Sequence, residues 1–188
     1  VTKRSSGVLM DDFKGFAKTD KQMLDGILRS EKGSRRRTPA DSVIWNQASK
    51  RPLGANGLTL QETVDAYYAS MKREVLQRIK MGRVNNESLA AVRADINGRL
   101  MTKFRNQANS LIATAYQHIS SVIQSYIEAM FYERYRWVAV LDEKTTDICR
   151  SRDGKTWRYG KGPIPPAHYN CRSKIVPVQD NNRNIPAP

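Results

Sequence analysis

The chain has 188 residues, of which 39% are hydrophobic and 8% aromatic, and its formal net charge is +14. It contains no apolar run of about 18 residues, and its N-terminus has no apolar stretch of signal-peptide length, so we expect neither a membrane span nor a secretion signal. The low hydrophobic and aromatic content predicts an extended helical protein that relies on a partner for part of its burial.

The basic excess is spread along the whole chain and is not confined to a tail. Such a charge favours nucleic acid or an acidic protein surface as a partner, and it says nothing about the fold. A solvated basic surface is the alternative interpretation.

Residues 1–57 are predicted to hold short helices and a basic linker. Asp20 can cap a short helix over the apolar stripe that ends at Leu28, and residues 41–47 predict another short helix. Between them lies an arginine triplet in a Gly/Ser/Pro setting, which predicts an exposed basic loop. The triplet is a candidate contact for DNA or an acidic surface, with a merely solvated loop as the alternative; its residues are Arg35, Arg36 and Arg37.

Residues 58–134 are predicted to be mainly helical. Thr59 and Glu62 have the spacing of a capping box, and apolar residues recur at helical intervals as far as Gly82, which predicts the end of this helix. Asn86 is the expected cap of the next helix, and Gly98 is expected to kink or divide the pattern that follows.

A wide apolar face extends over residues 104–131 and contains His118. A helix with such a face must be buried on most sides, against its neighbours or in an oligomeric assembly. We therefore interpret His118 as a buried or boundary histidine, in preference to a ligand or a base.

Residues 135–180 form a small module that contains both cysteines. A strand is expected over residues 136–141, a turn over 142–145, a hairpin at Asp153 and Gly154, and a last strand around Ile175. The polar tail of residues 181–188 is expected to be extended. The predicted fold class is thus α+β, predominantly α, with long helices in the N-terminal two-thirds and a small C-terminal α+β module of short strands and turns.

The order of punctuating residues in this module resembles the phage Mu protein F-like head morphogenesis family. The residues that carry the resemblance are Trp137, Asp142, Thr145, Cys149, Asp153, Gly154, Pro165, Pro166, His168, Asn170, Cys171 and Arg172. The long helical region that precedes the module also fits this family.

The resemblance implies a minor head protein of a tailed bacteriophage that acts in head morphogenesis, with DNA packaging or ejection as further roles. It implies a virion protein near the portal vertex, assembled in the host cytoplasm. Its partners would be the portal protein, which residues 58–134 would bind, together with packaged DNA and a scaffold or major capsid protein. The alternative is a basic nucleic-acid-binding module without a portal role, which would bind DNA with a steep salt dependence.

Cys149, His168 and Cys171 are candidate ligands of a metal such as zinc, because thiolate and imidazole suit Zn²⁺. Many relatives carry further cysteines at the positions of Thr146 and Ser173, so this chain lacks the fuller ligand set. A fourth donor would have to come from Asp147, from Asp142 or from water. The alternatives are two free thiols that pack as small apolar groups, or a disulfide, which a reducing cytoplasm disfavours.

We do not expect an enzyme. His168 near Asp142 or Asp153 is superficially similar to a nuclease site, but turns, a strand end and local packing account for all three residues, and the chain has no nucleophile elbow or phosphate-binding glycine loop. The module instead carries a candidate basic face for DNA or an acidic surface, formed by Arg150, Arg152, Lys155, Arg158 and Lys161.

Overall fold

The computed structural model describes residues 41–54 and 56–179. The expected helix that ends at Leu28, the loop of Arg35, Arg36 and Arg37 and the extended tail lie outside the described residues, whereas the short helix predicted over residues 41–47 is observed as part of a longer helix. The elements are α2 (Asp41–Lys50), α3 (Leu60–Val84), α4 (Leu89–Asp95), the π-helical turn η1 (Ile96–Leu100), α5 (Met101–Glu128), β1 (Arg134–Val138), α6 (Asp147–Arg152), β2 (Thr156–Arg158) and β3 (Lys174–Val178). The predicted class, predominantly α with a small α+β module, is confirmed.

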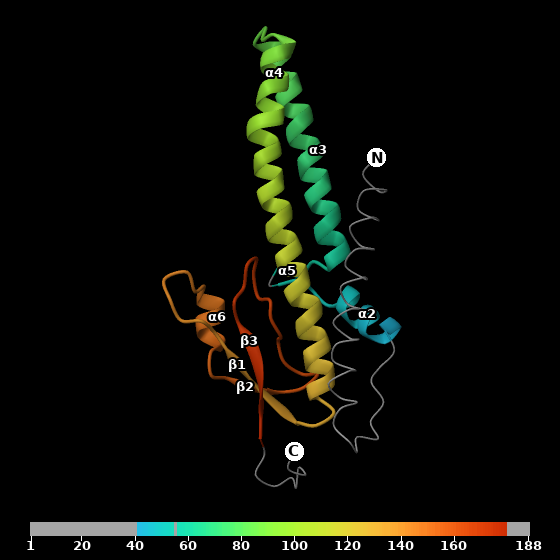
Figure 1. The fold of residues 1–188 in the computed structure, drawn as a ribbon, viewed down its shortest axis with the longest axis vertical. Helices are drawn as coiled ribbons and strands as arrows, with labels where there is room; N and C mark the ends of the chain where they lie inside the picture. The colour runs from blue at the N-terminus through green and yellow to red at the C-terminus, as the bar shows by residue number, and fades with distance from the viewer. Residues whose placement is uncertain (1–40, 55, 180–188) are drawn as a thin grey trace.

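Figure 1 shows a long antiparallel hairpin, formed by α3 on one side and by α4, η1 and α5 on the other, that projects from the rest of the molecule. The 25 residues of α3 correspond to about 37 Å of helix. The predicted capping box is confirmed, since Thr59 accepts a hydrogen bond from the Glu62 backbone and the Glu62 side chain accepts one from the Thr59 backbone. This cap fixes the point where the hairpin leaves the core.

The turn between α3 and α4 differs from the prediction. Gly82 does not end the helix, because α3 continues to Val84 with Asn85 as its C-terminal cap. Asn86 is not an N-cap either: it has a φ of 56°, and Ser88 caps α4 by accepting from the Ala91 backbone. The sequence pattern placed a stop at Gly82, whereas the glycine serves the close approach of the two helices at this point.

The expected irregularity at Gly98 is confirmed as a π-helical turn. The five residues of η1 include Gly98 and join α4 to α5 without breaking the helical path. A π-helical turn has wider hydrogen-bonded loops than an α-helix, so it changes the register of the helix faces on its two sides. Asp95, immediately before this turn, pairs with Arg78 of α3 and with Arg99, so side-chain pairs link the two sides of the hairpin here.

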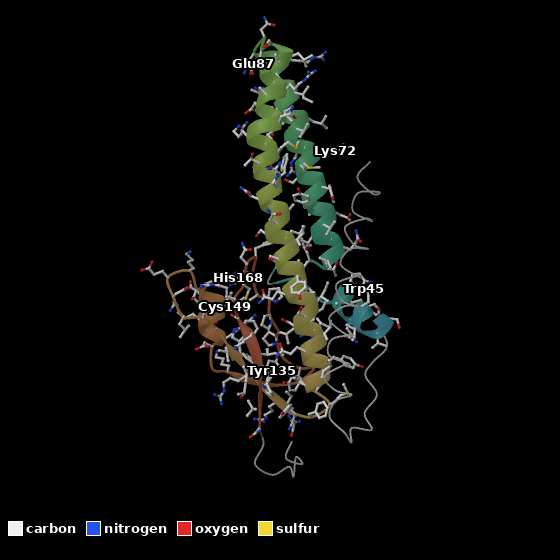
Figure 2. All side chains as sticks on the ribbon, in the orientation of Figure 1. Trp45, Lys72, Glu87, Tyr135, Cys149 and His168 are labelled. Atoms are coloured by element: carbon white, nitrogen blue, oxygen red, sulfur yellow. The ribbon has the colours of Figure 1, made fainter. Side chains whose placement is uncertain are left out.

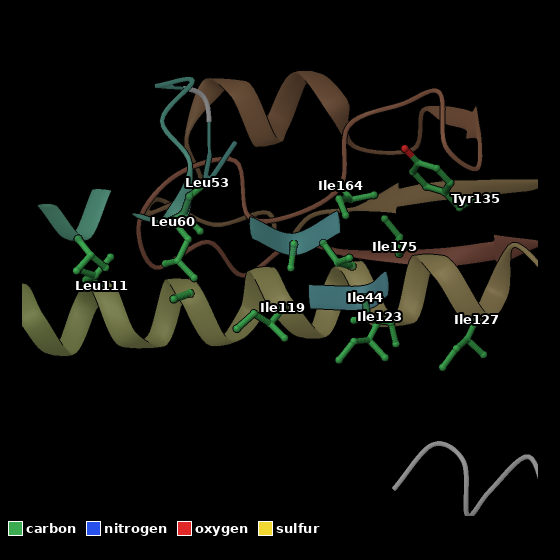
Figure 3. Packing of buried hydrophobic residues seen from close by; sticks show 14 residues of the cluster. Ile44, Leu53, Leu60, Leu111, Ile119, Ile123, Ile127, Tyr135, Ile164 and Ile175 are labelled. Carbon is green, nitrogen blue, oxygen red and sulfur yellow. The ribbon is translucent and has the colours of Figure 1, made fainter. Parts of the chain in front are cut away.

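The main core lies around the C-terminal half of α5, where α2 covers one side of the helix and the sheet another (Figure 3). The core residues of α5 are Leu111, Ala115, Ile119, Val122, Ile123 and Ile127, which meet Ile44 and Ala48 of α2, Leu60 and Val64 of α3, and Tyr135, Ile164 and Ile175 of the module. The expected burial of α5 on most sides therefore holds for this half of the helix. Even here Tyr116 and Tyr126 remain exposed.

His118 is buried, as the sequence predicted. Its Nε2 lies 2.9 Å from the backbone oxygen of Ala48 in α2. Because a carbonyl oxygen only accepts, Nε2 carries the proton. Desolvation by burial lowers the pKa of His118 below its ordinary value, so the neutral form is favoured.

The module contains a three-stranded antiparallel sheet in the order β2-β1-β3. β1 begins and ends earlier than the predicted strand, because Tyr135 and Trp137 are its two buried, inward-facing residues. Asp153 and Gly154 do not form a hairpin turn between strands. They link α6 to β2, and the Asp153 carboxylate accepts a hydrogen bond from the Ala139 backbone at 2.7 Å. Helix α6 itself was not predicted.

Polar contacts fix the module to α5. Gln117 and Gln124 donate to the backbone oxygens of Ser173 and Ile175 at 2.9 and 3.3 Å. The backbone N–H of Asn170 donates to the Thr114 hydroxyl. The loop that carries His168 and Cys171 is thereby held against a rigid helix.

Candidate functional site

The fold brings together the three residues that were predicted as metal ligands. The Sγ of Cys149 lies 3.2 Å from the Nε2 of His168 and 3.7 Å from the Sγ of Cys171. All three donor atoms lie within 4.8 Å of one another. Figure 2 labels Cys149 and His168, which lie close together in the module beside α5. We call these three residues the Cys–His cluster.

Two short segments supply the cluster. Cys149 lies in α6, which begins after Thr146. His168 and Cys171 belong to the loop before β3, where the Cys171 backbone N–H donates to the His168 carbonyl at 3.2 Å. The ring of His168 is oriented by a contact of 2.8 Å between its Nδ1 and the backbone oxygen of Tyr169. A carbonyl oxygen only accepts, so Nδ1 carries a proton, and Nε2 faces the Cys149 sulfur.

The surroundings of the Cys149 thiol act on its pKa in opposite directions. Burial raises the pKa of the Cys149 thiol, while hydrogen bonds from Ser173 and Thr146 act in the opposite direction. Ser173 and both cysteines are buried, whereas His168 is half-buried. The His168 imidazole and the Cys171 thiol are thus the groups that lie directly against the Cys149 sulfur.

Neither carboxylate that was considered as a fourth metal donor belongs to the cluster. Asp142 instead forms two hydrogen bonds of 2.6 Å with Arg172. The Arg172 guanidinium holds the pKa of Asp142 well below its usual range. Arg172 and the Lys144–Thr145 turn border a small hollow, which Cys149, His168 and Ser173 also line.

The predicted basic face is only partly assembled. Arg150, Lys155, Arg158 and Lys161 are exposed. Arg152 is half-buried, with its guanidinium carbon 5.2 Å from the centre of the Trp137 ring, so it contributes to packing inside the module. Arg158 also pairs with Glu133 at 3.0 Å. Whether these residues contact DNA or an acidic surface stays a prediction.

A second group of basic residues includes Arg158, which the sequence predicted, and three that it did not: Arg134, Arg136 and Lys174. Because side chains alternate along a strand, the exposed side of the sheet carries Arg134 and Arg136 of β1, Arg158 of β2 and Lys174 of β3. The register brings Arg134 opposite Arg158 and Val138 opposite Lys174. We call these four residues the outer sheet face. The alternation of basic and aromatic residues in Arg134-Tyr135-Arg136-Trp137 could have indicated a basic side of this strand. The sequence did not show which strands lie next to it.

The comparisons with known proteins decide the family. A family model described as "Phage Mu protein F like protein" matches residues 69–176, which is more than half of the chain. The chain belongs to this family. Membership of this family implies a protein of bacteriophage head morphogenesis. The matched residues include most of the hairpin, the whole Cys–His cluster and nearly all of the sheet.

The chain is also similar to an uncharacterized protein of Haemophilus influenzae, with 26% identity over 141 residues. The matched part covers 71% of this chain and 30% of the Haemophilus protein, so the chain spans less than a third of that relative. No solved structure matches the chain. None of the helices that the structure describes is long and apolar enough to cross a lipid bilayer.

Proposed function

We propose that this Phage Mu protein F-like chain is a minor head protein that binds the portal ring through the end of its helical hairpin and turns its C-terminal module towards DNA. The proposal rests on family membership and on one structural observation, the exposed apolar end of the hairpin. Head assembly is the process it would serve, with a part in DNA packaging or ejection.

The far end of the hairpin exposes an unusual amount of apolar side chain. Val84 and Leu89 are 69% and 72% exposed. We call the following group the hairpin tip: Leu76, Ile79, Met81, Val84 and Leu89. Exposed apolar groups that gather in one place mark an interaction site more often than a free surface. The tip lies far from the core, at the end of Figure 1 opposite to the module.

Ion pairs hold this end of the hairpin in a defined shape before any partner binds. Arg78 pairs with Asp95 and with Glu87, in each case at 2.6 Å, and thereby ties α3 to α4 and to the turn between them. A preorganised tip loses less conformational entropy on binding than a flexible loop.

Basic residues accompany the apolar ones at the tip. Lys80, Arg83 and Arg93 are exposed there. We therefore infer that the partner surface is acidic around an apolar centre, since opposite charges at the rim of an interface favour the encounter. The portal protein is the partner that the family suggests.

The outer sheet face supports the second half of the proposal. Four basic side chains on one side of a short sheet suit contacts to DNA phosphates without sequence readout. The sheet and the hairpin tip are separated by the length of the hairpin (Figure 1). The two surfaces can thus be occupied at once.

The rival function is a nucleic-acid-binding module without a portal role, and the basic sheet face is the observation that favours it. One experiment separates the two. The purified chain is mixed with assembled portal rings of the same phage, and separately with duplex DNA, each at low and at high salt. Stoichiometric, salt-tolerant binding to rings with weak, salt-sensitive binding to DNA supports the portal-associated protein. Tight DNA binding without ring association contradicts it.

A further inference from the structure

We propose that the Cys–His cluster is a zinc centre with two thiolates, one imidazole and a hydroxyl or water oxygen as its fourth ligand. The inference rests on the geometry of the cluster and does not depend on the proposed portal role. It concerns the residues Cys149, His168 and Cys171, with Ser173 beside them.

The distances between the donor atoms are close to those that a tetrahedral zinc site requires. With zinc–sulfur bonds of about 2.3 Å and zinc–nitrogen bonds of about 2.1 Å, a tetrahedron separates two sulfurs by about 3.8 Å and a sulfur from a nitrogen by about 3.6 Å. The two sulfurs lie 3.7 Å apart, and the Cys149 sulfur lies 3.2 Å from the His168 nitrogen. The remaining pair lies within 4.8 Å. A small rotation of side chains that already converge completes three corners of the tetrahedron.

The histidine is prepared for this role. Its Nδ1–H donates to the Tyr169 carbonyl, and its Nε2 faces the Cys149 sulfur. Metal-bound histidines commonly donate their other N–H to a backbone carbonyl, which fixes both the tautomer and the ring.

The fourth corner is lined by oxygen. Ser173 lines the same small hollow as Cys149 and His168, so its hydroxyl belongs to a residue beside the cluster. Lys144, Thr145 and Arg172 border the same hollow. Its size is close to the space that one water molecule occupies. The carboxylate of Asp142 is occupied by Arg172 and is not needed.

A metal here would cross-link the module. Cys149 belongs to α6, whereas His168 and Cys171 belong to the loop that α5 holds through Thr114 and Gln117. The core of the module around the cluster is small, with Trp137, Ala167 and the two cysteines as its buried residues. Binding of the ion would add to the folding free energy of the module, to which so small an apolar core contributes little.

An unpaired donor lies in the same small core. The Trp137 Nε1–H is buried without a hydrogen-bond partner among the described residues, although Trp137 packs in one cluster with both cysteines. Buried donors are nearly always paired in folded proteins. The two cysteines are the polar members of the cluster in which this indole packs.

The test uses the full chain, purified under reducing conditions. Metal content is measured by mass spectrometry, and the zinc-free chain is then titrated with Co²⁺. We expect one zinc ion per chain, and in the cobalt form the visible bands of tetrahedral Co²⁺ with a thiolate-to-cobalt charge-transfer band. In C149S or C171S this band should lose about half of its intensity or disappear, because one of two thiolates is removed. Asp142→Asn is the matched control and should keep the metal.

A second variant keeps the test decisive if the cysteine variants do not fold. Ser173→Cys adds a thiol at the proposed fourth corner, so it should bind zinc more tightly in competition with a chelator and raise the charge-transfer intensity by about half. The proposal is overturned if the reduced chain carries no zinc and gives only the weak spectrum of octahedral Co²⁺. A Cys149–Cys171 disulfide in chain isolated from the cytoplasm would overturn it equally.

Discussion

Gly82 of α3 lies directly against Val92 of α4, and a Cβ atom added to Gly82 would stand 2.3 Å from the Val92 Cγ2. This close approach sets the spacing of the two helices next to the hairpin tip. Gly82→Ala should therefore destabilise the tip by about 1–3 kcal/mol, which is the usual cost of overpacking. Hydrogen exchange of α3 and α4 amides measures the effect locally.

Gly98→Ala is the matched control, since no atom lies within 4 Å of a Cβ added there. It should leave tip exchange unchanged or slow it, because alanine favours helix over glycine by about 1 kcal/mol. Val92→Ala should rescue Gly82→Ala in the double variant. Equal effects of Gly82→Ala and Gly98→Ala would mean that the approach to Val92 is not the cause.

His118 should make the protein less stable as the pH falls. Its folded pKa is lowered by burial, so the unfolded chain binds a proton near pH 6.5 while the folded chain does not. The contribution is complete above about pH 6.5 and is lost as the pH falls from there towards the folded pKa. Urea unfolding at about pH 7.5 and at about pH 5 should show this decrease.

His118→Gln removes the titrating group. We expect a loss of about 1–3 kcal/mol at neutral pH, because the bond to Ala48 is disturbed, but a flatter pH dependence. If the wild-type slope persists in the variant, another group is responsible.

Asp95 should contribute to stability above its unfolded pKa and lose that contribution in acid. Hydrogen bonds from Arg99 and Arg78 lower its folded pKa, so protonation of the unfolded chain begins near pH 4 and the stabilising pairs are lost as the pH falls below that. Asp95→Asn should lower the protection factors of the tip amides at neutral pH, and should reduce the further loss of protection that acid causes in the wild type. Added salt should weaken the effect, since the pairs are partly exposed. Tip exchange that is the same in the variant and the wild type would show that these pairs do not hold the hairpin together.

The outer sheet face should carry the salt dependence of any DNA binding. Replacing Arg134, Arg136, Arg158 and Lys174 by glutamine should lower the slope of log K against log salt by about 3 to 4, because each phosphate that a basic side chain neutralises adds about 0.9 to that slope. The control removes the same charge from the hairpin, with K72Q, R73Q, R93Q and R105Q. If both variants lower the slope equally, DNA binding is not localised to the sheet.

Features of the fold that depend on neighbouring residues in the chain could be predicted from the sequence. The capping box of Thr59 and Glu62 needs only a spacing of three residues, and the burial of His118 follows from its apolar neighbours. Gly82 was misread because a glycine near a helix end usually marks a stop, whereas here it meets Val92 of the following helix. A single-residue signal contains no information about packing between two helices.

The sequence predicted the Cys–His cluster more completely than the outer sheet face. The family resemblance named Cys149, His168 and Cys171 together, and the fold brings them together. It did not show that Asp142 is held by Arg172 or that Ser173 lies at the Cys149 sulfur, because these arrangements depend on how the loop lies against α5. The outer sheet face depends on strand order and register, which alternation along one strand cannot supply.

Binding of tip variants to portal rings tests the central claim most directly. Val84→Ser with Leu89→Ser removes the two most exposed apolar side chains of the tip, and Val140→Ser with Leu141→Ser is the matched control on the module, where both side chains are also exposed. We predict that the tip variant loses ring binding at least tenfold, about 1.4 kcal/mol or more, while the control binds rings and both variants bind DNA like the wild type. Ring binding that survives unchanged in the tip variant would contradict the account.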